Sequence, residues 1–119
     1  MNVVWFKRDL RIHDHEPLSI ALKKNEPILC LHIIEPELWA QPDLSQRQYD
    51  FYIESLKDLI EDCANQSISF CVKVGSVVDI FKDIHKKYSI SHIFSYQETW
   101  NNWTYQRDIK LNKWTKESS

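Results

Sequence analysis

The sequence predicts an α/β fold, a doubly wound parallel sheet of about four strands in the order 3-2-1-4 with helices on both faces. Short apolar runs of strand length alternate along the chain with longer amphipathic runs of helical spacing. Strands that alternate with helices form a parallel sheet covered on both sides, and right-handed crossovers favour the doubly wound order. With 119 residues, of which 43% are hydrophobic, the chain can form one domain with its own core.

Four apolar runs have the length and the β-branched or aromatic content of strands. The second run is interrupted only by His32, and the third carries Lys73 near its end. The stretch 35–45 contains two prolines and is the longest expected loop. We therefore expect strands at residues 3–6, 28–34, 68–74 and 91–96.

The first two helices are predicted after the first and second strands. Pro17 suits the first turn of a short helix that continues to Lys24. The second helical pattern is the clearest, because apolar residues from Tyr49 to Cys63 follow a 3–4 spacing. Ser45 precedes this pattern and is the expected N-cap.

Two more helices follow the third and fourth strands. Ser76 is a candidate N-cap for a third helix, whose expected inner face holds Val77, Ile80, Phe81, Ile84 and Tyr88. A fourth helical pattern covers about residues 104–116, with Tyr105, Ile109 and Trp114 as the expected contacts.

Composition excludes several classes of function. Gly75 is the only glycine, so the chain has no phosphate-binding loop that needs several glycines. The net charge of −2 argues against direct DNA binding, because phosphate neutralisation supplies most of that affinity. Cys30, Cys63 and Cys71 lack zinc-site spacing and are expected as buried, reduced thiols. Without a signal peptide or a membrane-length apolar run, the expected compartment is the cytoplasm.

The chemically richest loops follow the first and fourth strands. In a doubly wound sheet, ligands bind at the carboxyl ends of strands, where the strand order reverses. In the order 3-2-1-4 this point lies between the first and fourth strands. The loops at that point are residues 7–16 and 97–103, and we expect a cavity where they meet the loop after the second strand.

The first of these loops carries three cations, Lys7, Arg8 and Arg11, close after a buried strand. Such cations can hold a phosphate or carboxylate. The alternative is that Asp9 pairs with two of them and the group only orders the loop. Residues 13–16 read His-Asp-His-Glu, but no third or fourth metal ligand follows, so an acidic helix start explains them better and no metal is predicted.

The second loop contains Trp100 and Trp103 with Glu98 and several amides. Aromatic faces beside a few polar groups suit a flat heteroaromatic ligand, and the alternative is that the indoles pack on other structure. Arg107 and Asp108 follow on the fourth helix, where an ion pair with the first loop is feasible. No nucleophile elbow, catalytic dyad or carboxylate pair is recognisable, so no catalytic residue is predicted.

The opening stretch Trp5-Phe6-Lys7-Arg8-Asp9-Leu10-Arg11, followed by His13-Asp14, resembles the DNA photolyase and cryptochrome family, whose pattern reads W-F-R-R-D-L-R-x-x-D. Further similarity runs through Ser45, Arg47, Phe51, Ser55, Leu56 and Leu59, and through the stretch from Gln97 to Trp114. The resemblance implies that residues 1–119 are the Rossmann-like N-terminal domain of that family. The family's FAD-binding helical domain would be absent, and its fifth strand would begin near or after Ser119.

The resemblance also implies a function. Family members are deoxyribodipyrimidine photo-lyases, which are flavoproteins that repair DNA, or blue-light sensors. Their C-terminal domain holds FAD, and in many members the N-terminal domain holds an antenna chromophore that passes excitation to FAD. This chain is therefore expected to bind an antenna and to pack on a C-terminal FAD domain, but not to catalyse repair alone. Whether it is a fragment or a truncated gene product stays open.

The antenna site is predicted from the resemblance together with the loops at the ends of the first, second and fourth strands. Its expected members are Lys7, Arg8, Asp9, Arg11, Ile34, Glu35, Pro36, Tyr96, Gln97 and Glu98. Trp100 stands where relatives commonly have glycine, and Trp103 and Thr104 stand where folate-binding relatives have Asn-Glu. The resemblance therefore favours a deazaflavin or flavin over a folate, with an empty pocket as the alternative.

Two other functions compete with antenna binding. The chain is alternatively a non-binding structural or interaction module, which self-associates as a homodimer through the exposed edge of its fourth strand and its tryptophan loops. An open sheet edge favours pairing with another strand. A nucleotide-binding domain of the adenine-nucleotide-hydrolase type is least favoured, because such domains carry a glycine-rich phosphate loop.

Overall fold

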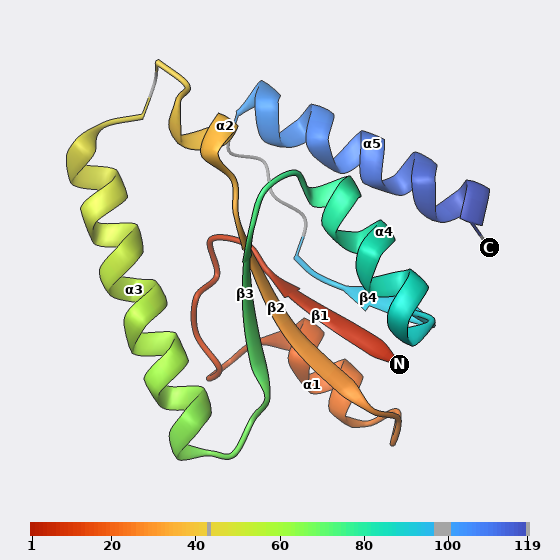
Figure 1. The fold of residues 1–119 in the computed structure, drawn as a ribbon. Coiled ribbons are helices and arrows are strands. Elements are labelled where there is room, and N and C mark those ends of the chain that lie inside the picture. The colour runs from red at the N-terminus through yellow and green to blue at the C-terminus, as the bar shows by residue number, and fades with distance from the viewer. Residues whose placement is uncertain (43, 97–100, 119) are drawn as a thin grey trace.

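The computed structural model describes residues 1–42, 44–96 and 101–118 (Figure 1). Its elements are, in chain order, β1 (Asn2–Phe6), α1 (Glu16–Leu22), β2 (Ile28–Ile34), α2 (Pro36–Trp39), α3 (Gln46–Asn65), β3 (Phe70–Val74), α4 (Val77–Tyr88), β4 (His92–Phe94) and α5 (Asn102–Ser118). The predicted strands and four predicted helices are all present. Helix α2 is an addition within the expected loop, because Pro36 occupies a first-turn position where its fixed backbone favours a helix.

The four strands form one parallel sheet in the order β3-β2-β1-β4, which confirms the predicted topology. Val3 of β1 is opposite Leu29 of β2 on one side and Ile93 of β4 on the other. Leu31 of β2 is opposite Cys71 of β3. Strand order therefore reverses between β1 and β4, and β1 is central and fully buried.

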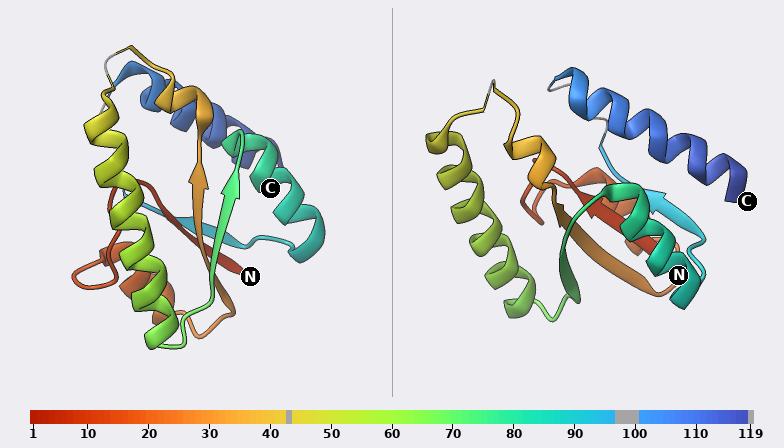
Figure 2. Two further views of the ribbon diagram at one scale, coloured as in Figure 1. Left: turned by 60° about the vertical axis from the view of Figure 1, so that its left-hand side comes forward. Right: turned by 45° about the horizontal axis from the view of Figure 1, so that its top comes forward.

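Helices cover both faces of the sheet (Figure 2). Val3 and Trp5 of β1 point to the face that α4 and α5 cover, where they pack with Phe81 and Leu111 among others. Val4 and Phe6 point to the opposite face, where α1 and α3 supply the apolar contacts. The alternation follows from the two-residue period of a strand. Within the described residues, no helix combines the length and hydrophobicity that a membrane crossing needs.

Local capping explains where the helices begin. Ser45 and Gln48 form a capping box at α3: the Gln48 amide donates to Ser45 Oγ at 3.1 Å, and the Ser45 amide donates to Gln48 Oε1 at 2.8 Å. At α1 the cap is His15, whose Nδ1 accepts from the Leu18 amide at 3.1 Å. Tyr88 was expected on the inner face of α4. It is 59% exposed instead, because it is the last residue of that helix.

Helix α5 presents a different face to the sheet from the expected one. Tyr105 and Ile109 are 54% and 44% exposed, whereas Arg107 and Leu111 are buried. Trp114 is half-buried and contacts the core as expected. The prediction was wrong for Tyr105 and Ile109 because the apolar residues of this helix do not form one stripe, and an ion pair decides its rotation.

The three cysteines are free. Cys30 and Cys63 are buried, as expected, but Cys71 on β3 is only half-buried because β3 is an edge strand. Burial and the neighbouring Cys63 raise the pKa of the Cys30 thiol to about 12. Cys30 is therefore a protonated core residue near neutral pH rather than a reactive thiolate.

Candidate functional site

A cavity of about 360 Å³ lies at the carboxyl ends of β1 and β2, beside α2 and α3. The segment after β1 contributes Lys7 and Arg8, and the end of β2 contributes Glu35. Helix α3 closes one side with a face that includes Arg47 and Tyr52. The cavity therefore lies at the carboxyl end of the sheet, where parallel α/β folds bind ligands.

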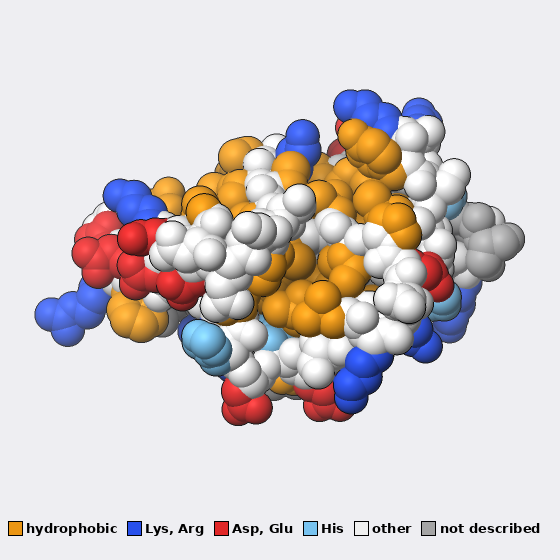
Figure 3. Space-filling view, turned by 90° about the horizontal axis from the view of Figure 1, so that it is seen from below, with side chains coloured by type: hydrophobic (Ala, Val, Ile, Leu, Met, Phe, Trp, Pro, Cys, Tyr) orange, Lys and Arg blue, Asp and Glu red, His pale blue; other side chains and the backbone are white. Residues whose placement is uncertain are grey.

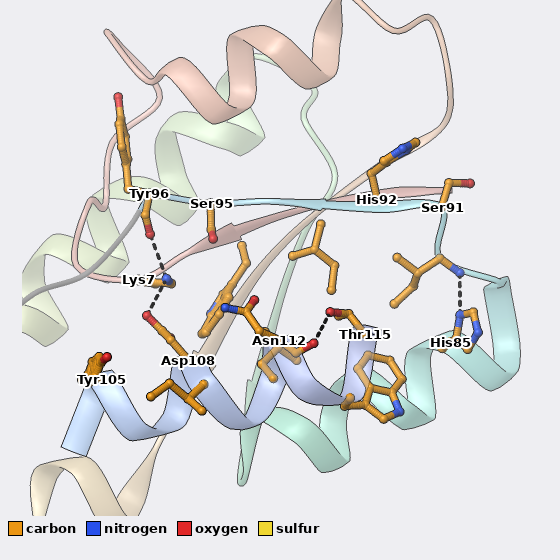
Figure 4. Close-up of a pocket in the computed structure, with 16 residues that line it drawn as sticks. Lys7, His85, Ser91, His92, Ser95, Tyr96, Tyr105, Asp108, Asn112 and Thr115 are labelled. Atoms are coloured by element: carbon orange, nitrogen blue, oxygen red, sulfur yellow. Dashed lines mark hydrogen bonds and ion pairs between the residues drawn. The ribbon is translucent and has the colours of Figure 1, made fainter. Parts of the chain in front are cut away.

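Three residues of this lining, Lys7, Glu35 and Arg107, belong to a chain of ion pairs that continues to Asp108. Arg107 Nη1 donates to both carboxylate oxygens of Glu35 at 2.9 Å, and Arg107 Nε donates to Asp108 Oδ1 at 3.0 Å. Lys7 Nζ donates to Asp108 Oδ2 at 3.2 Å and to the Tyr96 carbonyl at 2.8 Å (Figure 4). The expected ion pair between the fourth helix and the first loop is confirmed. These ion pairs attach α5 to the segments that follow β1 and β2, and Lys7 also links to the segment after β4 through the Tyr96 carbonyl.

The indole ring of Trp5 packs against the cationic groups of Lys7 and Arg107. The indole is 2% exposed, with Lys7 Nζ at 4.5 Å and Arg107 Cζ at 4.9 Å from the ring centroid. Phe81 packs edge-on against it at 5.5 Å between centroids. The negative face of an indole attracts a cation, so Trp5 offsets part of the cost of burying Lys7 and Arg107.

His32 and Tyr52 form a buried polar pair in the cavity wall. His32 Nδ1 donates to the Phe6 carbonyl at 2.7 Å, so its Nε2 is left to accept a hydrogen bond from the Tyr52 hydroxyl. Burial lowers the pKa of His32, against the opposing effect of the Phe6 hydrogen bond. Burial, followed by the nearby Glu35 carboxylate, raises the pKa of Tyr52. Both groups are therefore neutral near pH 7.

An aromatic cluster continues the same wall. Trp39 of α2 is tilted over Tyr52 with ring centroids 4.6 Å apart, and Tyr49 meets Trp39 edge-on at 5.2 Å. Phe51, also in the cavity lining, is 73% exposed. None of these aromatic residues was among the predicted site residues. The signal that could have found them was the adjacent pair Phe51-Tyr52, since neighbouring positions on a helix cannot both face the core.

Asp9 orders the first loop instead of facing the cavity. Its Oδ1 accepts from the Lys7 amide at 2.9 Å, and its other oxygen pairs with His15 Nε2. Burial alone would raise the pKa of Asp9, but the hydrogen bonds from His15 and Lys7 outweigh it and hold that pKa below 3.8. His15 stacks on Phe6, with centroids 4.5 Å apart. The carboxylate thus orders the loop through the Lys7 amide and the His15 ring.

Of the predicted site residues, Lys7, Arg8 and Glu35 come together in the cavity lining. Asp9 and Arg11 are outside that lining. Arg11 is exposed, and its Nη2 donates to the carbonyl of Asp14 at 3.2 Å. In the described part of the chain, no three His, Cys, Asp or Glu side chains cluster as metal ligands would.

The remaining predicted residues are dispersed. Ile34, half-buried at the end of β2, is not in the cavity lining. Pro36 lines a second cavity of about 300 Å³ on the other side of Glu35, and Tyr96 lines a groove beside β4. Gln97, Glu98 and Trp100 lie outside the described residues.

Comparisons with known proteins agree with this architecture. A family model described as DNA photolyase matches residues 2–119. The chloroplastic/mitochondrial cryptochrome DASH of Solanum lycopersicum is 28% identical over 103 residues, which is 82% of this chain and 18% of that protein. The deoxyribodipyrimidine photo-lyase of Escherichia coli K12 is 31% identical over 99 residues, or 78% of this chain and 21% of that protein.

The fold of this chain is also similar to that of a solved photolyase structure. The crystal structure of an archaeal photolyase from Sulfolobus tokodaii is similar with a TM-score of 0.83 and 25% identity, covering 98% of this chain and 27% of that one. That photolyase is described as holding two FAD molecules, with the implication of a novel light-harvesting cofactor. The present chain spans about a fifth of the length of the curated relatives that it matches.

Proposed function

The chain belongs to the DNA photolyase family, and from this premise we propose that its cavity beside α3 binds a flat, anionic, light-harvesting chromophore of the flavin or deazaflavin class. The chromophore would pass its excitation to FAD held by polypeptide outside these residues, and DNA repair or light sensing would be carried out there. The observation that carries the proposal is the concentration of cations and aromatic rings around one cavity.

The charge of the cavity lining is opposite to that of the whole chain. Lys7, Arg8, Arg47 and Arg107 contribute four cations to the lining, whereas the chain has a net charge of −2. Glu35 and Asp108 balance Arg107 and Lys7, and Arg8 and Arg47 add two further positive charges. Positive charge gathered in a cleft with low-dielectric walls attracts an anion. Arg47 is exposed on α3, where its guanidinium can hold a phosphate or an enolate oxygen of a ligand bound inside.

The shape and lining of the cavity suit a flat ring system. Its volume of about 360 Å³ falls within the range of small-molecule sites. Trp39 and Tyr52 present aromatic surface at one side, and Phe51 offers an exposed ring at another. Aromatic side chains bind planar heterocycles by offset or edge-on contacts, with the charged groups fixing the orientation.

Thr104 favours a flavin or deazaflavin over a folate. It stands where folate-binding relatives are expected to carry an acidic side chain. Thr104 is fully buried, and its hydroxyl donates to the Asn101 carbonyl at 2.9 Å while its amide donates to Asn101 Oδ1 at 2.9 Å. These contacts begin α5 and leave the side chain no role toward a ligand. The second FAD described for the Sulfolobus tokodaii photolyase also supports a flavin.

Titration of the purified chain with FMN, riboflavin and a 5-deazaflavin tests the proposal. We expect a shift in ligand absorbance and fluorescence at micromolar concentrations, and weaker binding of riboflavin because it lacks the phosphate. Arg47→Gln should weaken FMN binding about tenfold or more, since a charge-assisted hydrogen bond is lost. Lys57→Gln is the matched control, because Lys57 is an exposed cation of α3 outside the cavity lining.

Each negative result has a distinct meaning. No spectral change with any of the three ligands at high micromolar concentration would contradict chromophore binding. If FMN and riboflavin bind with equal affinity and Arg47→Gln does not change it, the cavity would still be a chromophore site. The idea that it recognises an anionic group of the ligand would then be wrong.

A further inference from the structure

Three aromatic side chains at one side of the cavity beside α3 are joined by hydrogen bonds. His32 of β2, Trp39 of α2 and Tyr52 of α3 all line the cavity, and we call them the inner wall. The Trp39 side chain hydrogen-bonds to Tyr52, and since an indole N–H can only donate, the Tyr52 oxygen is the acceptor. The Tyr52 hydroxyl donates to His32 Nε2, and His32 Nδ1 donates to the Phe6 carbonyl at 2.7 Å. The hydrogen bonds therefore run in one direction, from Trp39 to the Phe6 carbonyl.

This chain of hydrogen bonds uses the side-chain N–H and O–H groups of the inner wall completely. An indole, a phenol and a neutral imidazole each carry one such donor, and His32 is neutral near pH 7 because burial lowers its pKa. In the described part of the chain, the buried side-chain polar atoms without a partner belong to Asn2, which is not in the cavity lining. The inner wall thus offers a ligand aromatic surface but no side-chain hydrogen-bond donor.

The inner wall is not easily rearranged to serve a ligand. Tyr52 is only 9% exposed, and its ring contacts Trp39, with centroids 4.6 Å apart, and His32, with centroids 5.4 Å apart. If its hydroxyl turned toward a ligand, the buried Nε2 of His32 would lose its partner. An unpaired buried acceptor costs at least as much free energy as the new hydrogen bond would gain. The tautomer of His32 is also fixed, because the Phe6 carbonyl can only accept.

A flavin ring has two chemically different edges. One edge carries two methyl groups, and the opposite, pyrimidine edge carries two carbonyl oxygens and a ring nitrogen that accept hydrogen bonds. Acceptors that faced the inner wall would lose their hydrogen bonds to water and gain none, whereas methyl groups have none to lose. The cavity lining also contains the cations of Lys7, Arg8 and Arg47, whose N–H groups are suitable partners for such oxygens.

We propose that the inner wall holds the methyl-bearing edge of the chromophore ring and that Tyr52 makes this wall selective. The inference rests on the proposed function of the cavity and specifies which edge of the ring lies there. Tyr52 acts by occupying His32 Nε2, which would otherwise accept a hydrogen bond from a polar group of the ligand. The cavity therefore selects a ring with an alkyl group at this edge over one with a hydrogen-bonding group in the same place.

The test compares FMN with its analogue in which an amino group replaces the methyl group at ring carbon C8. The two groups have nearly the same size, but the amino N–H groups need acceptors. We expect the wild-type chain to bind the amino analogue with an affinity about tenfold lower or less, because its N–H groups lose water and meet a wall whose hydrogen bonds are already made. In Tyr52→Phe, His32 Nε2 is open to the amino group, so the preference for FMN should disappear or reverse. Tyr49→Phe removes a hydroxyl of the same helix that is outside the cavity lining, and it should keep the wild-type preference.

The ratio of the two affinities separates selectivity from damage to the structure. A variant that only loosens the fold weakens the binding of both flavins alike and leaves their ratio unchanged. Binding to another surface would also leave it unchanged. Hydrophobic side chains gather on the face seen from below (Figure 3), and a flavin bound there would not distinguish Tyr52→Phe from Tyr49→Phe. Circular dichroism of the three proteins confirms that they fold.

Nitrogen NMR tests the inner wall without a ligand. The chemical shifts of the His32 ring should show a proton on Nδ1 and none on Nε2 near neutral pH. A proton on Nε2, equal affinity of the wild type for both flavins, or the same affinity ratio in Tyr52→Phe as in the wild type would each overturn the inference. If neither flavin binds, the proposed function of the cavity is wrong, and this inference is wrong with it.

Discussion

Arg107 donates from one guanidinium nitrogen, Nη1, to both carboxylate oxygens of Glu35 at 2.9 Å, although 72 positions separate the two residues. The side chains are 7% and 5% exposed. Glu35 directly follows β2 and Arg107 lies in the second turn of α5, so the pair holds this helix over the carboxyl end of the sheet. Both residues also line the cavity beside α3 and the smaller cavity beside α4 and form a wall between them.

Breaking this pair from one side should be strongly destabilising. Glu35→Leu leaves the Arg107 cation buried with less compensation, and we expect the free energy of unfolding to fall by about 3–5 kcal/mol. The double variant Glu35→Leu with Arg107→Leu removes both charges and should cost clearly less than the single variant. Urea denaturation of the three proteins measures both differences. If the double variant is at least as unstable as Glu35→Leu, the buried charge of Arg107 is not the cause of the destabilisation.

His32 should make stability depend on pH just below neutrality. Burial lowers its pKa from 6.5, so the unfolded chain binds a proton more readily than the folded one. The stabilisation is therefore complete above pH 6.5 and is lost as pH falls toward the pKa of the folded state. His32→Gln should flatten this part of the profile of unfolding free energy against pH. His13→Gln, at an exposed position, is the control, and an unchanged slope in His32→Gln would reject the assignment.

Asp9 should affect the stability of the protein at a more acidic pH than His32 does. Its pKa is held below 3.8 in the folded state, so its stabilisation is present above that value and is lost as pH falls through the lower pKa. In Asp9→Asn, the decrease in stability that begins as the pH falls below about 3.8 should be absent. Asp14→Asn, an exposed carboxylate of the same loop, should leave it in place. Thermal denaturation from neutral to acidic pH makes the comparison, and identical acid profiles for wild type and Asp9→Asn would refute it.

Asn2 marks a site where a substitution should stabilise the protein. Both polar atoms of its side chain are buried, and neither has a hydrogen-bond partner among the described residues. Asn2→Leu keeps the branched shape of the side chain and removes that desolvation cost, so we expect the free energy of unfolding to rise by about 1–3 kcal/mol. Chemical denaturation measures the change. Asn2→Ala separates the polar cost from packing, and a loss of stability in both Asn2→Ala and Asn2→Leu would reject the buried amide as a destabilising group.

Hydrophobic periodicity along the chain is enough to predict most of the architecture. Strands from β1 to β4, their order and the start of α3 at Ser45 follow from local patterns and from general rules of handedness. Helix α2 was not predicted, because Pro36 suits both a loop and the first turn of a helix. The predicted face of α5 was also wrong. Tyr105 and Ile109 match a helical spacing as well as Leu111 does, and only the partners of a helix decide which stripe is buried.

For the candidate site, the sequence by itself determined that cations and a carboxylate follow β1 and β2, since the carboxyl ends of parallel strands share one edge of the sheet. Tertiary structure alone decided that Asp9 turns to His15, that Glu35 meets Arg107, and that α3 supplies the aromatic wall. The reason is physical. Strand and helix formation depend on neighbours within a few residues, whereas these side-chain contacts depend on how the helices pack across the sheet, and no local pattern encodes that packing.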